Sequence, residues 1–230
     1  MAHFDREIYF DMVRQTLFGG SMTDDQVKGQ KAILLRWEVE PTSDDVRHLA
    51  YALATTKHET GNTMLPIEEY GCGKGYDYGE IDPETGQTYY GRGFVQLTWR
   101  DNYARATAEL ALTESNDLEW HAERALDPYI AADVMFVGMH EGWFRPPNNL
   151  PLYFSDTADD PFGAREIING DSHIVPSWSG GLSIGKMIAQ YHGHFLDALN
   201  ASSQAKNVIK IDLKLPPGVK LEITVNGEPI

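Results

Sequence analysis

The chain has 230 residues, of which 42% are hydrophobic, 11% aromatic and 23% charged. Such a chain can bury a large core, and this composition excludes a disordered, collagen-like or coiled-coil protein. The formal charge of −15 argues against nucleic acid or an anionic membrane as a partner, so we expect recognition by shape and hydrogen bonds.

Apolar residues at helical spacing predict two helices in the first 40 residues. The first is predicted within FDREIYFDMVRQTLF (4–18), and the second follows Gly19, Gly20 and Ser21. Thr23 and Gln26 have the spacing of a capping box, which places the start of the second helix near Thr23.

A third helix is predicted over VRHLAYALATTKHE (46–59), with Ser43 or Asp44 as its N-cap. Residues 61–93 then lose all periodicity and are rich in Gly, Tyr and acidic residues. A loop of this length is uncommon in a folded domain unless it is functional, so we interpret it as the wall of a cleft.

The remaining core is also predicted to be helical. FVQLTW (94–99) is a short buried segment, 102–112 starts a helix, and 125–144 is a longer helix with Pro128 in its first turn. A short helix within 161–170 and a last one over 181–200 follow. Three tryptophans are expected in the core: Trp37, Trp99 and Trp143.

The C-terminal end changes character. Residues 201–207 (ASSQAKN) resemble a linker, and apolar residues then alternate with polar ones over 208–226 around a Pro-Pro-Gly turn, which predicts a β-hairpin. We therefore expect a catalytic domain over 1–200, a linker over 201–207 and a hairpin extension over 208–230. An isolated hairpin is marginal in water, so this one is expected to mediate self-association or attachment.

Nothing in the sequence predicts membrane insertion or secretion. No apolar run is long enough to cross a bilayer, and the first residues lack the basic and apolar regions of a signal peptide. The single cysteine, Cys72, cannot form an internal disulfide, which agrees with synthesis in a cytoplasm.

Metal and nucleophile chemistry are poorly supported. His58 and Glu59 begin a zinc-protease pattern, but the stretch HETGN lacks its second histidine, and Cys72 has no nearby histidine. No metal or organic cofactor is implied. Carboxylates remain: Glu59 ends a predicted helix, and Glu68 and Glu69 follow in the loop. Two carboxylates on opposite sides of a cleft are the minimum apparatus for glycoside hydrolysis.

Two stretches carry a family resemblance. ALATTKHETGNTMLPIEEYG (52–71) and YYGRGFVQLTWRDNYARA (89–106) resemble the core of glycoside hydrolase family 19, which includes class I chitinases and phage or prophage endolysins. REIING (165–170) is similar to a later motif of the family. The opening residues resemble its phage-type branch, so the resemblance spans about residues 4 to 198. It implies a mainly α, lysozyme-like, two-lobed domain with a central cleft.

The resemblance assigns the catalytic roles. It places the general acid on Glu59, where the end of the helix dipole and apolar neighbours would help the carboxyl keep its proton. The second carboxylate falls on Glu69 or Glu68, with Glu69 fitting the phage-type pattern better. Thr98 stands where the family uses a hydroxyl to hold the attacking water.

The resemblance also implies sugar contacts, which we expect from Gln96, Asn102, Asn169, Tyr70 and Arg92. Side-chain amides suit this work because they donate and accept hydrogen bonds together. Arg92 has a second interpretation, in which it pairs with a catalytic carboxylate or anchors its loop. The arginine that some members supply near the last helix has no clear match, and Lys186 is the closest candidate.

We therefore expect an inverting hydrolase of β-1,4 bonds between N-acetylated sugars, acting on peptidoglycan as a phage or prophage endolysin. It would be made in the host cytoplasm and reach the wall after release or delivery. A chitinase is the alternative within the class. A catalytically silent wall-binding or virion structural protein is the alternative outside it. The joint presence of Glu59, a glutamate at the second spacing, Gln96 and Thr98 argues against that alternative.

Overall fold

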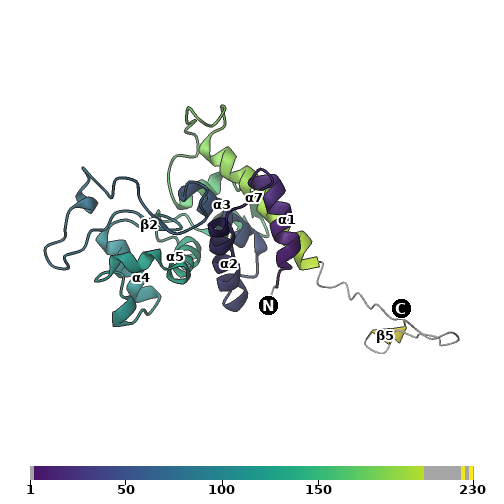
Figure 1. Cartoon of the computed structure of the whole chain (residues 1–230), viewed down its shortest axis with the longest axis horizontal. Coiled ribbons are helices and arrows are strands. Elements are labelled where there is room, and N and C mark those ends of the chain that lie inside the picture. Colours follow the sequence, from purple (N-terminus) through teal and green to yellow (C-terminus); the bar gives the residue numbers. More distant parts are fainter. Residues whose placement is uncertain (1–2, 205–223, 226–227, 230) are drawn as a thin grey trace.

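The computed structural model describes residues 3–204, 224–225 and 228–229, and it is mainly helical (Figure 1). The helices and strands in chain order are α1 (Arg6–Leu17), α2 (Asp24–Val39), α3 (Val46–Glu59), β1 (Ile67–Glu68), η1 (Asp77–Gly79), β2 (Arg92–Gly93), α4 (Arg100–Glu109), η2 (Glu114–Asn116), η3 (Ala122–Leu126), α5 (Pro128–Glu141), α6 (Leu150–Tyr153), β3 (Phe154–Ser155), β4 (Ala158–Asp159), η4 (Gly163–Ile167), α7 (Ile184–Gln204), β5 (Thr224–Val225) and β6 (Glu228–Pro229). The predicted helices are confirmed. No helix in the described ranges combines the length and the apolar character that crossing a bilayer requires.

Helix α3 lies at the centre of the core. Every residue from His48 to Lys57 is buried, which agrees with a sequence rich in Ala and Leu on all sides of the helix. Helix α7 packs along both α3 and α1, and α2 packs against α5 (Figure 1). The last turn of α3 carries His58 and Glu59 at the edge of this core. The buried part of the helix therefore fixes the position of both residues.

The predicted helix starts are largely confirmed. The backbone N–H of Thr23 donates to Gln26 Oε1 over 2.9 Å, and the Gln26 N–H donates back to Thr23 Oγ1 over 3.2 Å, so the capping box forms. Helix α3 instead takes Asp45 as its N-cap, since this side chain accepts from the Arg47 N–H. Ser43 contributes indirectly, by accepting from the Asp45 N–H.

One helix glycine is required by close packing. A Cβ atom on Gly29 of α2 would lie 1.6 Å from the carbonyl oxygen of Met64, so α2 and the chain after α3 approach as closely as backbone allows. We expect Gly29→Ala to lower the free energy of unfolding by about 2 kcal/mol, because the clash outweighs the helix propensity of Ala. Denaturant titration measures this.

Gly193 of α7 provides a matched control for that substitution. It is also a helix glycine, but nothing lies within 4 Å of the position its Cβ would take. Gly193→Ala should therefore raise the free energy of unfolding by about 1 kcal/mol. Equal effects of the two substitutions would contradict the packing argument.

The last helix extends beyond the predicted domain boundary. Helix α7 continues through Gln204, so the first four residues of the predicted linker 201–207 are helical. The reason is packing at its end: Ser202 is fully buried, its hydroxyl donates to the Leu199 carbonyl, and its own carbonyl accepts from the Asp5 N–H over 3.1 Å. The rest of the linker lies outside the described residues.

The predicted hairpin over 208–226 lies outside the described residues, apart from 224 and 225. Within the described part of this end, β5 and β6 form a two-residue antiparallel pair with Val225 opposite Glu228. The proposed role of the extension therefore stays a prediction.

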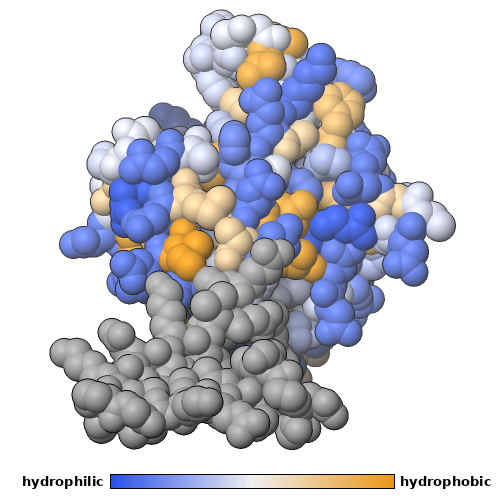
Figure 2. Space-filling model, turned by 90° about the vertical axis from the view of Figure 1, so that its right-hand side faces the viewer, coloured by the Kyte–Doolittle hydropathy of each residue, from blue (hydrophilic) through white to orange (hydrophobic). Residues whose placement is uncertain are grey.

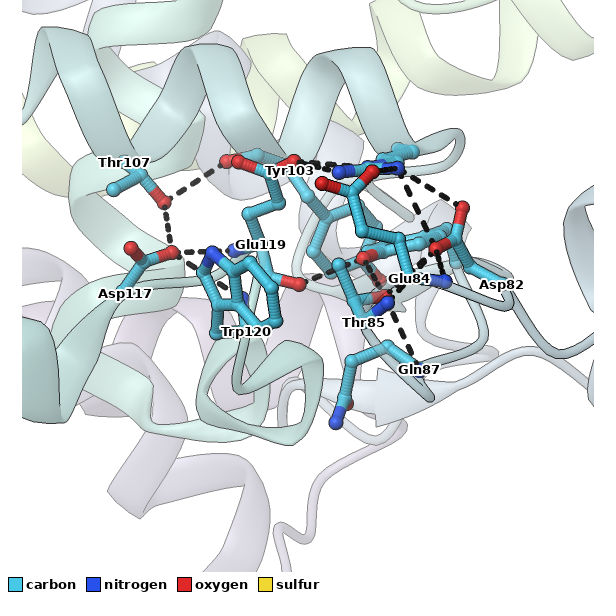
Figure 3. A network of polar contacts seen from close by, with 11 residues as sticks. Asp82, Glu84, Thr85, Gln87, Tyr103, Thr107, Asp117, Glu119 and Trp120 are labelled. Atoms are coloured by element: carbon cyan, nitrogen blue, oxygen red, sulfur yellow. Dashed lines mark hydrogen bonds and ion pairs between the residues drawn. The ribbon is translucent and has the colours of Figure 1, made fainter.

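The long loop over 61–93 is anchored at both ends. Strands β1 and β2 pair antiparallel, with Glu68 opposite Arg92, and close its base. A polar network holds its outer part against α4 (Figure 3): the Arg100 guanidinium bonds Asp82, Glu84 and Glu119 at 2.7–3.2 Å. These contacts hold the loop at its base and along α4, and its interpretation as the wall of a cleft stays a prediction.

Two of the three tryptophans expected in the core are buried, namely Trp37 and Trp143. The prediction for Trp99 is wrong, because its side chain is 51% exposed. Trp99 precedes α4 with a φ of 75°, and this turn directs its ring outward, where the centres of the Trp99 and Tyr78 rings lie 5.1 Å apart in an edge-to-face arrangement.

Candidate active site

The end of α3 opens into a cleft of about 300 Å³. Four separate segments form it: the last residue of α3, the stretch from Val95 to Asn102, Phe144 after α5, and residues 168–169 after η4. The lining side chains are Glu59, Val95, Gln96, Thr98, Trp99, Asn102, Phe144, Ile168 and Asn169. The structure therefore brings together five residues that the sequence selects: Glu59, Gln96, Thr98, Asn102 and Asn169.

Glu59 is ion-paired to a buried arginine. Nη1 of Arg165 bonds Glu59 Oε1, and Nε and Nη2 of the same guanidinium bond the two carboxylate oxygens of Asp171 at 2.6 and 3.0 Å. Arg165 is 2% exposed. Burial alone would lower the pKa of Arg165, but its bonds to Asp171 and Glu59 outweigh this and raise the pKa.

This pairing corrects two expectations. Glu59 is not enclosed by apolar neighbours alone, since a cation contacts one of its carboxylate oxygens. The cation that pairs with Glu59 is Arg165 of the REIING stretch, whereas Lys186 is exposed on α7. Arg165 lies 106 positions from Glu59, so neither periodicity nor local spacing could reveal the pair. The REIING motif, which begins with Arg165, was the only sequence signal that pointed to this residue.

Removing this cation should destabilise the protein. We expect Arg165→Met to lower the free energy of unfolding by about 3 kcal/mol, because two partly buried carboxylates lose the cation that both contact. Arg145→Met is the control, since Arg145 pairs with Glu166 at the surface and its loss should cost about 1 kcal/mol at most. If denaturant titration gives equal losses, the Arg165 cluster contributes no more than a surface ion pair.

Glu68 and Glu69 are consecutive residues with different environments. Glu69 Oε2 accepts from the Gly91 N–H over 2.9 Å, and its Oε1 accepts from the Tyr78 hydroxyl over 3.3 Å. A Cβ atom on Gly91 would lie 3.2 Å from Glu69 Oε2 and 2.9 Å from Gln96 Oε1, so Glu69 and the cleft residue Gln96 border the same glycine.

Glu68 belongs to a different cluster. Its Oε1 accepts from the Tyr90 hydroxyl over 2.6 Å and lies 3.6 Å from Arg92 Nε. Burial and this hydrogen bond raise the pKa of Tyr90 to about 12. The shared border at Gly91 therefore places Glu69 beside Gln96, a residue that lines the cleft.

Arg92 anchors the loop and is not placed to bind substrate. It is 5% exposed, donates to the Thr88 carbonyl over 2.8 Å and to the Tyr103 hydroxyl over 3.2 Å, and lies 3.7 Å from the centre of the Tyr90 ring. The predicted sugar contact of Arg92 is wrong for this reason, and the anchoring interpretation holds. The Tyr90 ring packs against the Arg92 guanidinium in this anchor.

Tyr70 lies free at the mouth of the loop. Its side chain is exposed, and its hydroxyl would lie 3.6 Å from a Cβ atom on Gly61, just after the end of α3. It thus stands beside the turn that carries Glu59. The expected sugar contact of Tyr70 fits this position and stays a prediction.

The polar side chains of the cleft are partly bound to protein. Gln96 Nε2 donates to the carbonyls of Ile67 and Gly93, so its amide hydrogens serve the backbone. The Thr98 hydroxyl donates to the Gln96 carbonyl over 2.8 Å, and Asn102 Nδ2 donates to the Thr98 carbonyl over 2.8 Å. The Thr98 oxygen is thereby left as an acceptor.

Tyr76, Tyr78 and Trp99 form an aromatic cluster beside the cleft, which the sequence did not predict. The rings of Tyr76 and Tyr78 stack at 5.0 Å, and Tyr78 meets Trp99, which lines the cleft. Tyr76 and Trp99 are both exposed. Exposed ring faces next to a polar cleft suit stacking on sugars.

Metal ligation has no structural counterpart in the described part of the chain. No group of three or more His, Cys, Asp or Glu side chains in it could hold a metal ion. Burial lowers the pKa of His58, which directly precedes Glu59 in α3.

Comparison with known proteins concerns the fold. No protein-family model and no curated protein matches the chain. Chitinase C from Streptomyces griseus HUT6037 is similar in structure with a TM-score of 0.53 and 21% identity, covering 86% of this chain and 76% of that one. A class IV chitinase of family GH19 from Zea mays is similar with a TM-score of 0.52 and 15% identity, covering 86% and 96%. The chain therefore has the lysozyme-like fold of family 19 chitinases, as the sequence resemblance implies.

Proposed function

We propose that this protein is a glycoside hydrolase that cleaves β-1,4 bonds between N-acetylated sugars of peptidoglycan with inversion of configuration. The observation that carries the proposal is the cleft itself, in which Glu59 opens toward a wall of hydroxyl and amide groups from Thr98, Asn102 and Asn169. Neutral donors and acceptors around one carboxylate match a polymer rich in hydroxyl and acetamido groups.

Glu59 is the proposed general acid. It would protonate the glycosidic oxygen as the bond to the sugar carbon breaks, a step that needs one positioned carboxylic acid. Arg165 forms ion pairs with both Glu59 and Asp171, so Glu59 is not its only anionic partner. We infer that Arg165 positions Glu59 before cleavage and stabilises its carboxylate afterwards.

Glu69 is the proposed general base. The Gly91 N–H and the Tyr78 hydroxyl fix the orientation of its carboxylate, which could then take a proton from water on the opposite face of the sugar. Thr98 would hold this water: its hydroxyl proton is used by the Gln96 carbonyl, so its oxygen accepts a hydrogen from the water. An inverting site needs about 6.5 to 9.5 Å between the two carboxyls.

A chitinase is the second candidate, and the fold comparison favours it because both similar structures reported above are chitinases. Mass spectrometry of digested peptidoglycan and of chitin oligomers separates the two. Our proposal expects soluble peptidoglycan fragments with a new reducing-end sugar, which also identifies the bond cut. Cleavage of chitin oligomers alone would establish the chitinase.

A silent wall-binding or virion structural protein would bind cell walls and release nothing. Sedimentation with purified walls, followed by assay of the supernatant for reducing sugar, distinguishes this class from an enzyme. The endolysin setting, in which the protein reaches the wall after release or delivery, is part of our proposal and rests on the resemblance of the N-terminal residues. Lysis of cells only when the protein is applied outside the inner membrane would support it.

A further inference from the structure

A second hollow lies next to the last turn of α3, separate from the catalytic cleft. Its volume is about 400 Å³, and residues from α1, α3, α7 and the loop before α7 contribute to it. The side chains that matter here are Phe18, Lys57, His58, Asn62, Trp178 and Tyr191. Lys57 and His58 directly precede Glu59, so this hollow and the catalytic cleft are lined by residues of the same helical turn. One turn of an α-helix is about 5.4 Å long.

Lys57 is a buried cation without an anionic partner in the described ranges. Its side chain is 7% exposed, and its Nζ lies 4.2 Å from the centre of the Phe18 ring and 5.1 Å from that of Tyr191. Nζ also donates to Asn62 Oδ1. No Asp or Glu of residues 3–204 forms an ion pair with it, although the chain carries 34 acidic residues. Charges this deeply buried are normally paired.

We propose that this hollow binds a carboxylate-bearing side group of the glycan, and that Lys57 is the residue that selects it. The inference rests on the proposed function, since it names the substrate as an acidic, peptide-bearing polymer of N-acetylated sugars. Chitin carries no carboxylate, whereas the peptides attached to the lactyl groups of peptidoglycan carry free carboxylates. The site thus distinguishes the two polymers by charge.

The chemistry of the hollow suits such a group. Lys57 has three N–H donors, of which Asn62 accepts one, so two remain for a carboxylate. The rings of Phe18, Tyr191 and Trp178 offer apolar walls for the methyl groups of lactyl and alanyl units. The net charge of −15 disfavours acidic ligands over most of the surface. Binding of a carboxylate in this hollow should therefore depend on the charge of Lys57.

The loop over 170–183 contributes Trp178 to the wall of the hollow. It projects at the top of Figure 1 before α7, and the same region at the top of Figure 2 shows hydrophobic side chains among hydrophilic ones. Trp178 is 68% exposed there. Figure 2 otherwise shows hydrophobic residues in separated places on this face.

The recognition should depend on pH through Lys57 alone. Burial lowers the pKa of Lys57 to about 8, so the free site loses its cation as the pH rises through that value. His58 stays neutral over this range because burial lowers its pKa, and Tyr191 stays neutral because burial raises its pKa. Phe18, Asn62 and Trp178 carry no charge.

Binding of N-acetylmuramyl-L-alanine and of its neutral methylamide to the full chain tests the proposal by calorimetry. Neither ligand has a glycosidic bond, so the result does not depend on hydrolysis. At about pH 6.5 we expect the acid to bind about tenfold more tightly than the methylamide. Lys57→Met should reduce this ratio to about one, and Lys31→Met, which removes an exposed lysine of α2, should preserve it.

Titration of the unmodified protein provides a second test that requires no variant to fold. The ratio between acid and methylamide should fall toward one as the pH is raised through about 8. A ratio near one at all pH values, or a ratio that Lys57→Met leaves unchanged, overturns the proposal. A protein that shows the preference but cleaves no glycan would refute the proposed function and leave this site standing.

Discussion

Glu59→Gln is expected to lower kcat/KM on its glycan substrate by about 1,000-fold while leaving the fold intact. Glutamine has nearly the same volume, and its carbonyl oxygen can still accept the hydrogen bond from Arg165. It has no proton to give to the leaving oxygen, which is the step assigned to Glu59. Initial rates of reducing-sugar release measure the loss, and a thermal unfolding curve checks the fold.

Glu141→Gln is a matched control, because Glu141 is also the last residue of its helix, α5, and is exposed. It should keep full activity. If Glu59→Gln retains most of the wild-type kcat/KM, Glu59 is not the acid, whatever its position in the cleft.

The two loop glutamates should respond unequally to the same substitution. Glu69→Gln is expected to lower kcat by about 100-fold, because an amide cannot take the proton of the attacking water. Glu68→Gln should change kcat by about threefold or less, since Glu68 faces Tyr90 and Arg92. Both losses are read from initial rates at saturating substrate.

A reversed order of these two effects would assign the general base to Glu68. It would also show that the position of Glu69 beside Gly91 and Gln96 does not identify the reacting carboxylate. Small effects of both substitutions would reject a two-carboxylate mechanism for this protein. The expected difference arises because consecutive side chains at the end of β1 have different partners.

Local signals predicted most of the helical architecture. The capping box of Thr23 and Gln26 and the proline at the start of α5 are short-range features, and both occur where the sequence places them. The end of α7 could not be predicted in this way. Ser202 looks like a linker residue, and only its burial and its bond to Asp5, nearly 200 positions away, keep the helix intact.

The site was predictable in its residues but not in its contacts. Motif positions selected Glu59, Gln96, Thr98, Asn102 and Asn169, which the structure places in one cleft. The ion pair with Arg165 depends on how distant segments pack, and the exposure of Trp99 depends on one turn with positive φ. Composition also could not tell that Arg92 is buried, because its length and charge are typical of a surface residue.

The anomeric form of the first product tests the central claim most directly. Proton NMR of a peptidoglycan glycan chain, recorded within the first minutes of digestion, shows the configuration of each new reducing end before it equilibrates. Direct attack of a Glu69-activated water on a β-1,4 bond predicts the α-anomer first. Initial appearance of the β-anomer would contradict the two-carboxylate inverting account, and the absence of any new reducing end would contradict the assignment as a peptidoglycan hydrolase.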